Sequence, residues 1–405
     1  MIMETPKGMR DFLPKDMMVR EEVFQKIRET FREFGYVPLE TPALEYLSTL
    51  NAKNTGGEEI AGQIFALNDE KLGLRFDLTV PLARVAASTS FPKPFKRYQI
   101  GRVWRREEPQ KGRYREFWQA DVDIVGCASM RAEGELLEVA SLALRRLGFS
   151  EFKILLNNRK ILNGVLEAGG IREKQRAMRI LDKADKVGEK EAERMMREEF
   201  GEKGEEILKM LSTRGTNEEK LASVEHYSTE GAQELREILS YFPDAVIDLR
   251  MVRGLGYYSG PIYEIKAPGL SATIAAGGRY DGLLSIYGKA EPATGISLGV
   301  ERIALLLAEK QEKKTYTKIF IASLPEAYSY ALSVARKLRE GGIETETDIM
   351  GRALGKQLDY ANSQGIPFVA VVGKKEMEEK KITLKDMKSG VSSYLSVEDA
   401  LRKLK

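Results

Sequence analysis

The sequence predicts an α+β chain in which an antiparallel core is interrupted by a helical insertion and followed by a small α/β domain. Two strand-like runs, 96–104 and 116–125, flank a charged loop and indicate a long antiparallel hairpin. Residues 159–243 are rich in Glu, Lys, Arg and Met and are broken by glycines, which is typical of several short helices. Residues 318–405 alternate between strand and helix patterns. The length of 405 residues accommodates two to three such domains.

The first part of the core begins with an amphipathic helix over 16–34. Its apolar residues recur at three- and four-residue steps, at Val23, Phe24, Ile27, Phe31 and Phe34. An extended segment over 36–39 then leads to Pro42. The patterns that follow predict strands over 62–68 and 72–79, a helix from Pro81 to Ala87, the hairpin, a helix over 131–147 and a strand over 153–156.

The second part of the core follows the insertion. Strands are expected over 262–266 and 271–276, and a third over 295–300 runs directly into a helix over 301–309. The charged run 310–314 reads as a linker. In the last domain we expect a mixed sheet built from strands 319–322, 343–347, 368–372, 381–386 and 391–395, with helices 326–340, 354–364 and 397–404.

Composition excludes several kinds of chemistry. Cys127 is the only cysteine and His226 the only histidine, so an internal disulfide is impossible and a Cys/His zinc site lacks ligands. His226 lies in a charged helical stretch, where a surface or capping role is expected. Acid–base and charge chemistry must therefore come from Asp, Glu, Lys, Arg and Tyr. The net charge of +3 points to no particular partner.

No apolar run approaches the eighteen residues of a membrane span, and the first residues lack a signal-peptide pattern. We therefore expect a cytoplasmic protein without a membrane partner.

The hairpin carries the strongest candidate for a binding site. Residues two apart on a strand share a face, so Arg105 and Glu107 point the same way. Arginine forks onto phosphate or carboxylate, and Arg113 in the loop adds a second guanidinium. Phe117 on the returning strand offers a flat face to a purine. A solvated basic hairpin, or one that contacts only RNA backbone, fits the spacing equally well.

Two glycine-rich segments are further candidates. In Gly295–Arg302, a glycine-flanked strand enters a helix whose first turn carries Arg302, and the glycines allow a ligand close to the backbone. In Val252–Tyr258, Arg253 stands beside glycines and two tyrosines. Tight helix packing explains the first segment, and a bend in a strand the second, without any ligand.

Together these segments resemble the class II aminoacyl-tRNA synthetases, and specifically the histidyl-tRNA synthetase family. The helix 16–34 with Pro42 resembles class II motif 1, the hairpin motif 2 and Gly299–Arg302 motif 3. The segments typical of the histidine family are Arg253–Tyr258, Ala276–Asp281, Arg75–Thr79, Pro109–Arg115 and Lys7–Asp11. The resemblance covers nearly the whole chain, but Gly256 stands where the family usually has Asp.

The resemblance implies a ligase that joins L-histidine to tRNA(His) with ATP, bound as its Mg²⁺ complex, and without zinc. Arg105 and Arg253 would be catalytic at the α-phosphate, with Arg253 also reaching the histidine carboxylate. The ATP site would comprise Arg105, Glu107, Arg113, Phe117 and Arg302. The histidine site would comprise Asp77, Thr79, Gln119, Asp123, Arg253, Tyr257, Tyr258 and Tyr280.

The resemblance also implies a domain plan and a homodimer joined through motif 1. Residues 1–158 and 244–309 would form the antiparallel-sheet catalytic domain, 159–243 its helical insertion, 310–317 a linker and 318–405 the α/β anticodon-binding domain. A catalytically silent relative that senses histidine, such as the regulatory subunit of ATP phosphoribosyltransferase, is the alternative. A pure RNA-binding protein is a third class, but it would not need Asp77, Thr79 and Gln119.

Overall fold

The computed structural model describes residues 3–52, 62–67, 71–110, 112–183, 187–254, 256–269, 272–308 and 314–405. The chain divides into two compact units, Met1–Asp11 with Val19–Glu309 and Phe12–Met18 with Lys310–Lys405. Most of the expected linker, 310–313, lies outside the described residues. No described helix is long and apolar enough to cross a membrane.

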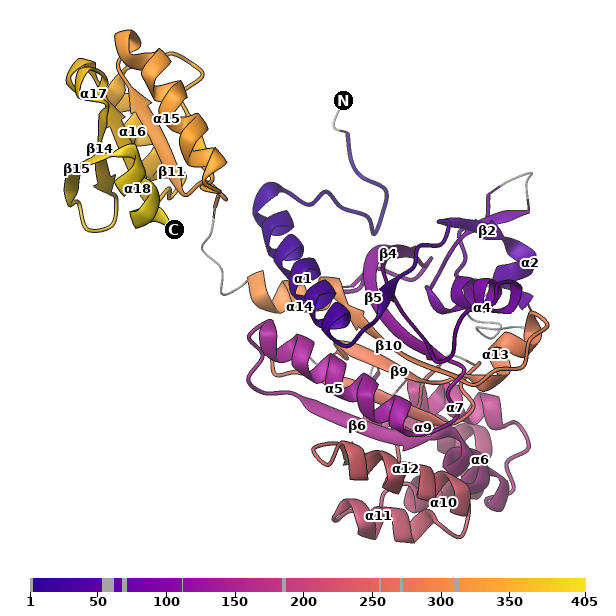
Figure 1. Cartoon of the computed structure of the whole chain (residues 1–405). Helices are drawn as coiled ribbons and strands as arrows, with labels where there is room; N and C mark the ends of the chain where they lie inside the picture. Colours follow the sequence, from indigo (N-terminus) through magenta and orange to yellow (C-terminus); the bar gives the residue numbers. More distant parts are fainter. Residues whose placement is uncertain are drawn as a thin grey trace. The chain divides into compact units, whose positions relative to one another are not determined.

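The first unit is built on an eight-stranded sheet in the order β1-β4-β5-β10-β9-β8-β6-β7 (Figure 1). Only the outer pairs, β1 with β4 and β6 with β7, are parallel. The antiparallel core expected from the sequence is therefore present. The strands are β1 (Val37–Pro38), β4 (Phe95–Trp104), β5 (Glu116–Val125), β6 (Lys153–Asn158), β7 (Val246–Ile247), β8 (Pro261–Lys266), β9 (Ala275–Arg279) and β10 (Ala293–Gly299).

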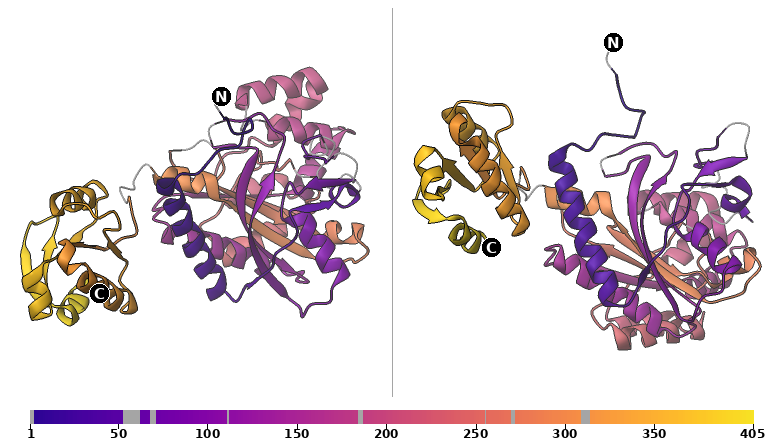
Figure 2. Two further views of the ribbon diagram at one scale, coloured as in Figure 1. Left: turned by 90° about the horizontal axis from the view of Figure 1, so that it is seen from above. Right: turned by 45° about the horizontal axis from the view of Figure 1, so that its top comes forward.

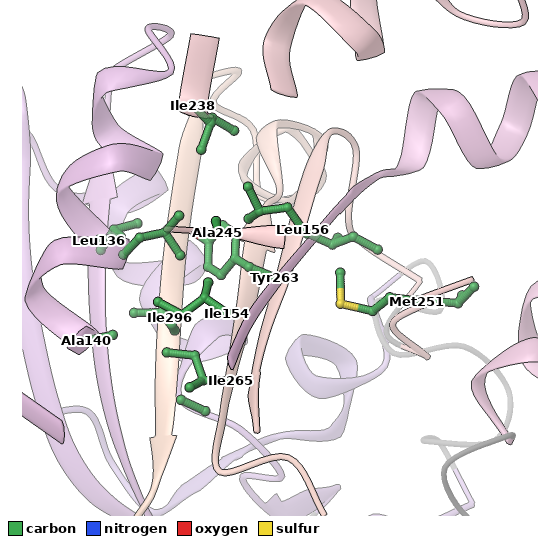
Figure 3. Packing of buried hydrophobic residues seen from close by; sticks show 14 of the residues in the cluster. Leu136, Ala140, Ile154, Leu156, Ile238, Ala245, Met251, Tyr263, Ile265 and Ile296 are labelled. Carbon is green, nitrogen blue, oxygen red and sulfur yellow. The ribbon is translucent and has the colours of Figure 1, made fainter. Parts of the chain in front are cut away.

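Helices α1 (Pro14–Glu33), α5 (Arg131–Arg146) and α14 (Val300–Ala308) pack on this sheet. The apolar stripe of α1 packs against the sheet, and Val23, Phe24, Ile27 and Phe31 are buried in the same core. Figure 3 shows Leu136 and Ala140 of α5 beside apolar side chains of β6, β8 and β10. The stripe thus explains packing within the chain and is no evidence for a second subunit.

The segment 159–243 is helical, as its composition predicts. Its helices are α6 (Arg159–Ala168), α7 (Lys174–Asp182), α9 (Glu189–Phe200), α10 (Glu202–Met210), α11 (Asn217–Val224) and α12 (Thr229–Tyr241). They lie beside β6 at one end of the sheet (Figure 1), and α12 contacts both α5 and β6. Local signals set their limits: Thr216 and Glu219 form a capping box at the start of α11.

The region before the hairpin differs from the expected strands. Within 62–67 only the isolated bridge from Ala66 to Gly73 forms, and the second strand is limited to β3 (Leu72–Leu74), paired with β2 (Leu44–Tyr46) before the short helix α2 (Leu47–Leu50). Helix α4 (Thr79–Ser88) begins two residues before Pro81. The reason is that Asp77 Oδ1 accepts a hydrogen bond from the Val80 amide at 3.0 Å, which satisfies a donor of the first turn.

Strand β9 also lies later than the sequence predicts, and it includes Gly277 and Gly278. Gly277 pairs with Ile296 of β10, and a Cβ on Gly277 would stand 2.0 Å from the Gly295 carbonyl oxygen. The glycine therefore serves close approach within the sheet rather than ending the strand. Helix α13 (Asp281–Ile286) follows directly.

The second unit holds a five-stranded mixed sheet in the order β12-β11-β13-β14-β15 (Figure 2). The first three strands are parallel and the last two antiparallel, as the alternating pattern predicts. Its elements are β11 (Ile319–Ser323), the 3-10 turn η2 (Pro325–Ala327), α15 (Tyr328–Glu340), β12 (Thr345–Thr347), α16 (Leu354–Ser363), β13 (Phe368–Val372), α17 (Lys374–Glu379), β14 (Lys381–Asp386), β15 (Ser392–Ser396) and α18 (Val397–Leu404).

Candidate active site

One cavity of about 260 Å³ in the first unit is lined by every site residue expected from the sequence pattern or from the family resemblance. These residues come from five separate stretches of the chain and meet only in the fold. They are Asp77, Thr79, Arg105, Glu107, Arg113, Phe117, Gln119, Asp123, Arg253, Tyr257, Tyr258, Tyr280 and Arg302.

The alternation of strand β5 separates this cavity from the core. The even positions Ala120, Val122 and Ile124 pack in the apolar cluster with α1. The odd positions Gln119, Asp121 and Asp123 carry polar side chains and line the cavity on the opposite face. Strand β10 behaves in the same way, with Leu298 in the core and Ser297 at the cavity.

Four of the residues that line the cavity are arginines, Arg105, Arg113, Arg253 and Arg302, and the charges of the first three act on Arg302. Arg105 is fixed by a 2.9 Å hydrogen bond from its Nε to the Phe76 carbonyl. Burial, and then the positive charges of the other three arginines, lowers the pKa of the Arg302 guanidinium to about 10. Such a cluster of like charges is matched by a ligand with several negative charges, and phosphate oxygens suit the guanidinium fork.

Arg302 owes its place to the start of α14. The preceding residue, Glu301, forms a buried ion pair with Arg20 of α1 at 2.6 Å and accepts a hydrogen bond from the Trp118 amide at 2.9 Å. Arg302 itself donates to the carbonyls of Gly112 and Thr273. Helix α14 is thereby anchored to both α1 and β5.

Arg253 is held by an acidic residue from β8. Its Nη1 lies 2.7 Å from Glu264 Oε1, while the other carboxylate oxygen accepts a 2.7 Å hydrogen bond from the Thr273 hydroxyl. Burial alone would lower the pKa of Arg253, but the charge of Glu264 raises it. The Arg253 guanidinium therefore stays charged and has a fixed orientation.

Beside the arginines lies a site suited to a flat ring. The guanidinium carbon of Arg105 is 5.2 Å from the centre of the Phe117 ring. Glu107 is steadied by Arg113, whose Nη1 is 3.5 Å from its carboxylate, and by the 2.9 Å bond from Arg115 Nε to its backbone carbonyl.

A second group of lining residues, which we call the acidic end, consists of carboxylates and tyrosines that are bonded to one another. Asp123 Oδ1 accepts a 2.5 Å hydrogen bond from the Tyr280 hydroxyl, and its Oδ2 lies 2.9 Å from Nη2 of the fully buried Arg97. The Tyr257 hydroxyl points to Asp77 Oδ2 at 3.4 Å. Burial raises the pKa of Asp77 to about 6 and also raises that of Asp123. Buried carboxylates beside tyrosines suit a small ligand that offers N–H donors.

Several residues at the cavity escaped the sequence patterns. Asp121 and Ser297 line it, and the two-residue period of a strand puts Asp121 on the same face as Gln119 and Asp123, which the resemblance implies. Glu264 supports Arg253 from a neighbouring strand, and no local signal in the sequence reveals that contact. Asp182, the last residue of α7, brings the helical insertion to the cavity wall.

The two residues considered for metal or nucleophilic chemistry lie elsewhere. His226 is exposed in the turn between α11 and α12, with its ring 3.8 Å from that of Tyr227. Cys127 is a half-buried free thiol. In the part of the chain that the structure describes, no three His, Cys, Asp or Glu side chains gather as metal ligands.

Two family models cover nearly the whole chain. The model described as histidyl-tRNA synthetase matches residues 8–303, and the model described as anticodon binding domain matches residues 318–405. Among curated proteins, the histidine–tRNA ligase of Korarchaeum cryptofilum is 40% identical over 94% of this chain and 93% of its own. That of Pyrococcus horikoshii is 34% identical over 100% and 99%.

Solved structures agree with this assignment. Histidyl-tRNA synthetase from Nostoc matches with a TM-score of 0.86 at 28% identity, covering 100% of this chain and 99% of that one. A Bacillus halodurans structure described as an ATP phosphoribosyltransferase regulatory subunit/histidyl-tRNA synthetase matches with a TM-score of 0.74 at 25% identity, over 92% and 98%. From its cavity, its sheet and these similarities over its full length, the chain belongs to the histidyl-tRNA synthetase family.

Proposed function

We propose that the protein activates L-histidine with ATP and transfers the histidyl group to tRNA(His). The observation that carries this proposal is that four arginines line the same cavity as buried carboxylates and tyrosines. The arginines suit a triphosphate, and the carboxylates and tyrosines suit the amino group and imidazole of histidine. ATP enters as its magnesium complex.

In the first step the histidine carboxylate attacks the α-phosphorus, an oxygen–phosphorus bond forms, and pyrophosphate leaves. The attacking carboxylate is already ionised, so no general base is required. Negative charge grows on the non-bridging oxygens, and fixed cations stabilise it best. Arg105 contacts the α-phosphate, and Arg253, oriented by Glu264, bridges that phosphate and the histidine carboxylate.

We assign the remaining ATP contacts to other residues that line the same cavity. Arg113 and Arg302 hold the outer phosphates, where their mutual repulsion is relieved by the ligand. Phe117 stacks on the adenine, and Glu107 accepts a hydrogen bond from its amino group. The salt bridge between Arg113 and Glu107 couples the two ends of the nucleotide.

At the acidic end, Asp77, Thr79 and Gln119 hold the α-amino group. Asp123 and Tyr258 face the imidazole, while Tyr257 and Tyr280 line the pocket and fix the two carboxylates through their hydroxyls. When an amino acid without an imidazole enters a site built to hydrogen-bond both ring nitrogens, the polar groups of the site lose their partners. Such a site therefore discriminates strongly between histidine and other amino acids.

The second step moves the histidyl group to the terminal ribose of tRNA(His). Residues 318–405 bind the anticodon, and the helices of 159–243 hold the acceptor arm close to the cavity that Asp182 borders. In this plan, 1–158 and 244–309 form the catalytic domain and 310–317 the linker. The protein works in the cytoplasm.

The functional unit is a homodimer. The segment after α1 supports this proposal better than the stripe of α1 does, because β1 is an edge strand of the large sheet. Val37 of β1 is 49% exposed, and Leu44 and Tyr46 of the following strand β2, in the small sheet with β3, are 42% and 64% exposed. Pairing two such edges would cover them.

A histidine-sensing relative without catalysis is the second candidate, but the complete set of four arginines disfavours it. The test is charging of tRNA with radioactive L-histidine. The proposal predicts label on tRNA(His) that depends on ATP, with no label from other amino acids. Binding of histidine without any charging of tRNA would instead support the sensor.

A further inference from the structure

A third carboxylate lies in the cavity beside Asp77 and Asp123. Asp121 stands in the middle of the β5 run Gln119, Asp121, Asp123, whose side chains share one face of the strand. Asp121 lines the cavity and is only 3% exposed. The proposed contacts to ATP and histidine make no use of it.

The hydrogen bonds around Asp121 leave two acceptors without donors. Gln119 Nε2 donates to the Ser297 hydroxyl at 2.8 Å, and that hydroxyl donates in turn to the Asp121 carboxylate. The NH₂ group of the Gln119 side chain is therefore already engaged with Ser297. Its Oε1 is buried with no hydrogen-bond partner among the described residues. Asp121 Oδ1 is buried and equally unpaired.

The neighbouring carboxylates differ, because each already has a charged or hydrogen-bonding partner, although Asp123 Oδ2 has only the ion pair with Arg97 and no hydrogen bond among the described residues. Asp123 has Arg97 and the Tyr280 hydroxyl, and Asp77 has the Val80 amide and the Tyr257 hydroxyl. Buried polar atoms in folded proteins are nearly always paired. Two orphaned acceptors on adjacent same-face positions therefore point to a ligand that brings several N–H donors and a positive charge.

We propose that Asp121 is a further amino-acid-binding residue, and that its Oδ1 and Gln119 Oε1 together accept hydrogen bonds from the α-ammonium group of the substrate. This inference rests on the proposed function and adds a third carboxylate to the proposed histidine site. An ammonium has three N–H donors, and one donor can be shared between two acceptors, so Asp77 and Thr79 keep the contacts proposed above. Binding of the ammonium favours the ionised form of Asp121.

The charges around Asp121 set the expected pH dependence. Asp123 lies on the same strand, Arg97 on β4, Asp77 and Arg75 ahead of α4, and Ser297 on β10. Tyr257 and Tyr258, in the loop before β8, also interact with its charge. Burial, and then the charge of Asp123, raises the pKa of Asp121 to about 7 in the free protein. Near pH 6 the side chain is mostly neutral and resembles asparagine, whereas above pH 7 it is mostly a carboxylate.

The test is the dissociation constant of L-histidine, measured by calorimetry on the full chain for wild type and Asp121→Asn. The substitution keeps the shape and removes a buried charge. Asp359→Asn, on an exposed aspartate of α16, is the matched control. At about pH 7.5 we expect Asp121→Asn to weaken histidine binding about 10- to 100-fold, the range for a hydrogen bond to a charged group. The control should match wild type.

The dissociation constant of Asp121→Asn divided by that of wild type should fall towards one at about pH 6. At that pH wild-type Asp121 is protonated, while the ammonium of histidine stays charged. A ratio that grew at low pH would place Asp121 against the imidazolium and overturn the assignment. A ratio within about twofold of one at about pH 7.5 would also overturn the assignment. A ratio that does not change with pH would do the same, because it would indicate a purely structural role for Asp121.

The protons released on binding give a second test of the same claim. At about pH 7, histidine binding should release protons, seen as different binding heats in two buffers of different ionisation enthalpy, and Asp121→Asn should release fewer. Equal release by both proteins would contradict the proposal. A wild-type protein that binds no histidine at all would overturn the proposed function, and this assignment with it.

Discussion

At the scale of single residues, the sequence identified the cavity well because its side chains belong to short, distinctive runs. All the candidates from Asp77 to Arg302 line one space. Residues that act through long-range contacts were not foreseen. Glu264 of β8 meets Arg253 of the preceding loop, and Arg97 meets Asp123 across β4 and β5, so neither pair has a local signature.

Arg253 should be the most sensitive residue for adenylate formation. Arg253→Ala removes a fixed cation at the reacting phosphate and should lower histidine-dependent pyrophosphate exchange about 10²- to 10³-fold. Arg253→Lys should recover little, because a point charge cannot bridge two anions as the guanidinium fork does. Arg194→Ala, on an exposed arginine of α9, is the control. Near-normal exchange by Arg253→Ala would refute its role.

Glu264 should act as a positioning residue for Arg253. Glu264→Gln keeps the shape but removes the charge that holds the guanidinium at 2.7 Å. We expect kcat for pyrophosphate exchange to fall about tenfold, with little change in KM for ATP, since the lost interaction matters most in the transition state. Glu199→Gln, in an exposed ion pair with Arg176, serves as the reference. An effect on KM alone would argue for a binding role instead.

At the scale of elements, periodicity predicted the long helices and strands, because their apolar faces are buried against the sheet. It failed where contacts override local preference. The run 62–67 carries strand-forming residues but finds only one bridging partner, and Asp77 starts α4 earlier than Pro81 suggests. The helical insertion was recognised from composition, but its approach to the cavity through Asp182 was not.

The packing of α5 on the sheet should dominate the stability of the first unit. Leu136 is fully buried in the cluster of Figure 3. Leu136→Ala should lower the free energy of unfolding by about 2–5 kcal/mol, through lost burial and the cavity left behind. Leu67→Ala, at a leucine that is 42% exposed, should change it by less than about 0.5 kcal/mol. Urea unfolding followed by circular dichroism measures both, and equal effects would contradict the packing described.

At the scale of the whole molecule, the two units have separate sheets and separate cores, and every proposed contact to ATP and histidine lies in the first. The second unit presents basic side chains such as Lys356, which is 78% exposed. Contacts of that kind to tRNA phosphates weaken with salt. Activation and tRNA charging are therefore expected to be separable.

Removal of residues 314–405 should leave pyrophosphate exchange within a few-fold of the full chain and sharply reduce tRNA charging, because binding energy from a remote part of the substrate is lost. The truncated protein must first show cooperative unfolding and the same oligomeric state as the full chain by light scattering. Undiminished charging by a folded truncated protein would contradict anticodon binding by this unit.

The central claim is that the cavity joins ATP to histidine and to no other amino acid. ATP–pyrophosphate exchange by the full chain, measured with each of the twenty amino acids in turn and without tRNA, tests it most directly. The account predicts rapid exchange with L-histidine and background rates with the other nineteen, because only histidine offers both an ammonium and imidazole N–H donors to the acidic end of the cavity. Exchange at background level with L-histidine, or equal exchange with another amino acid, would contradict it.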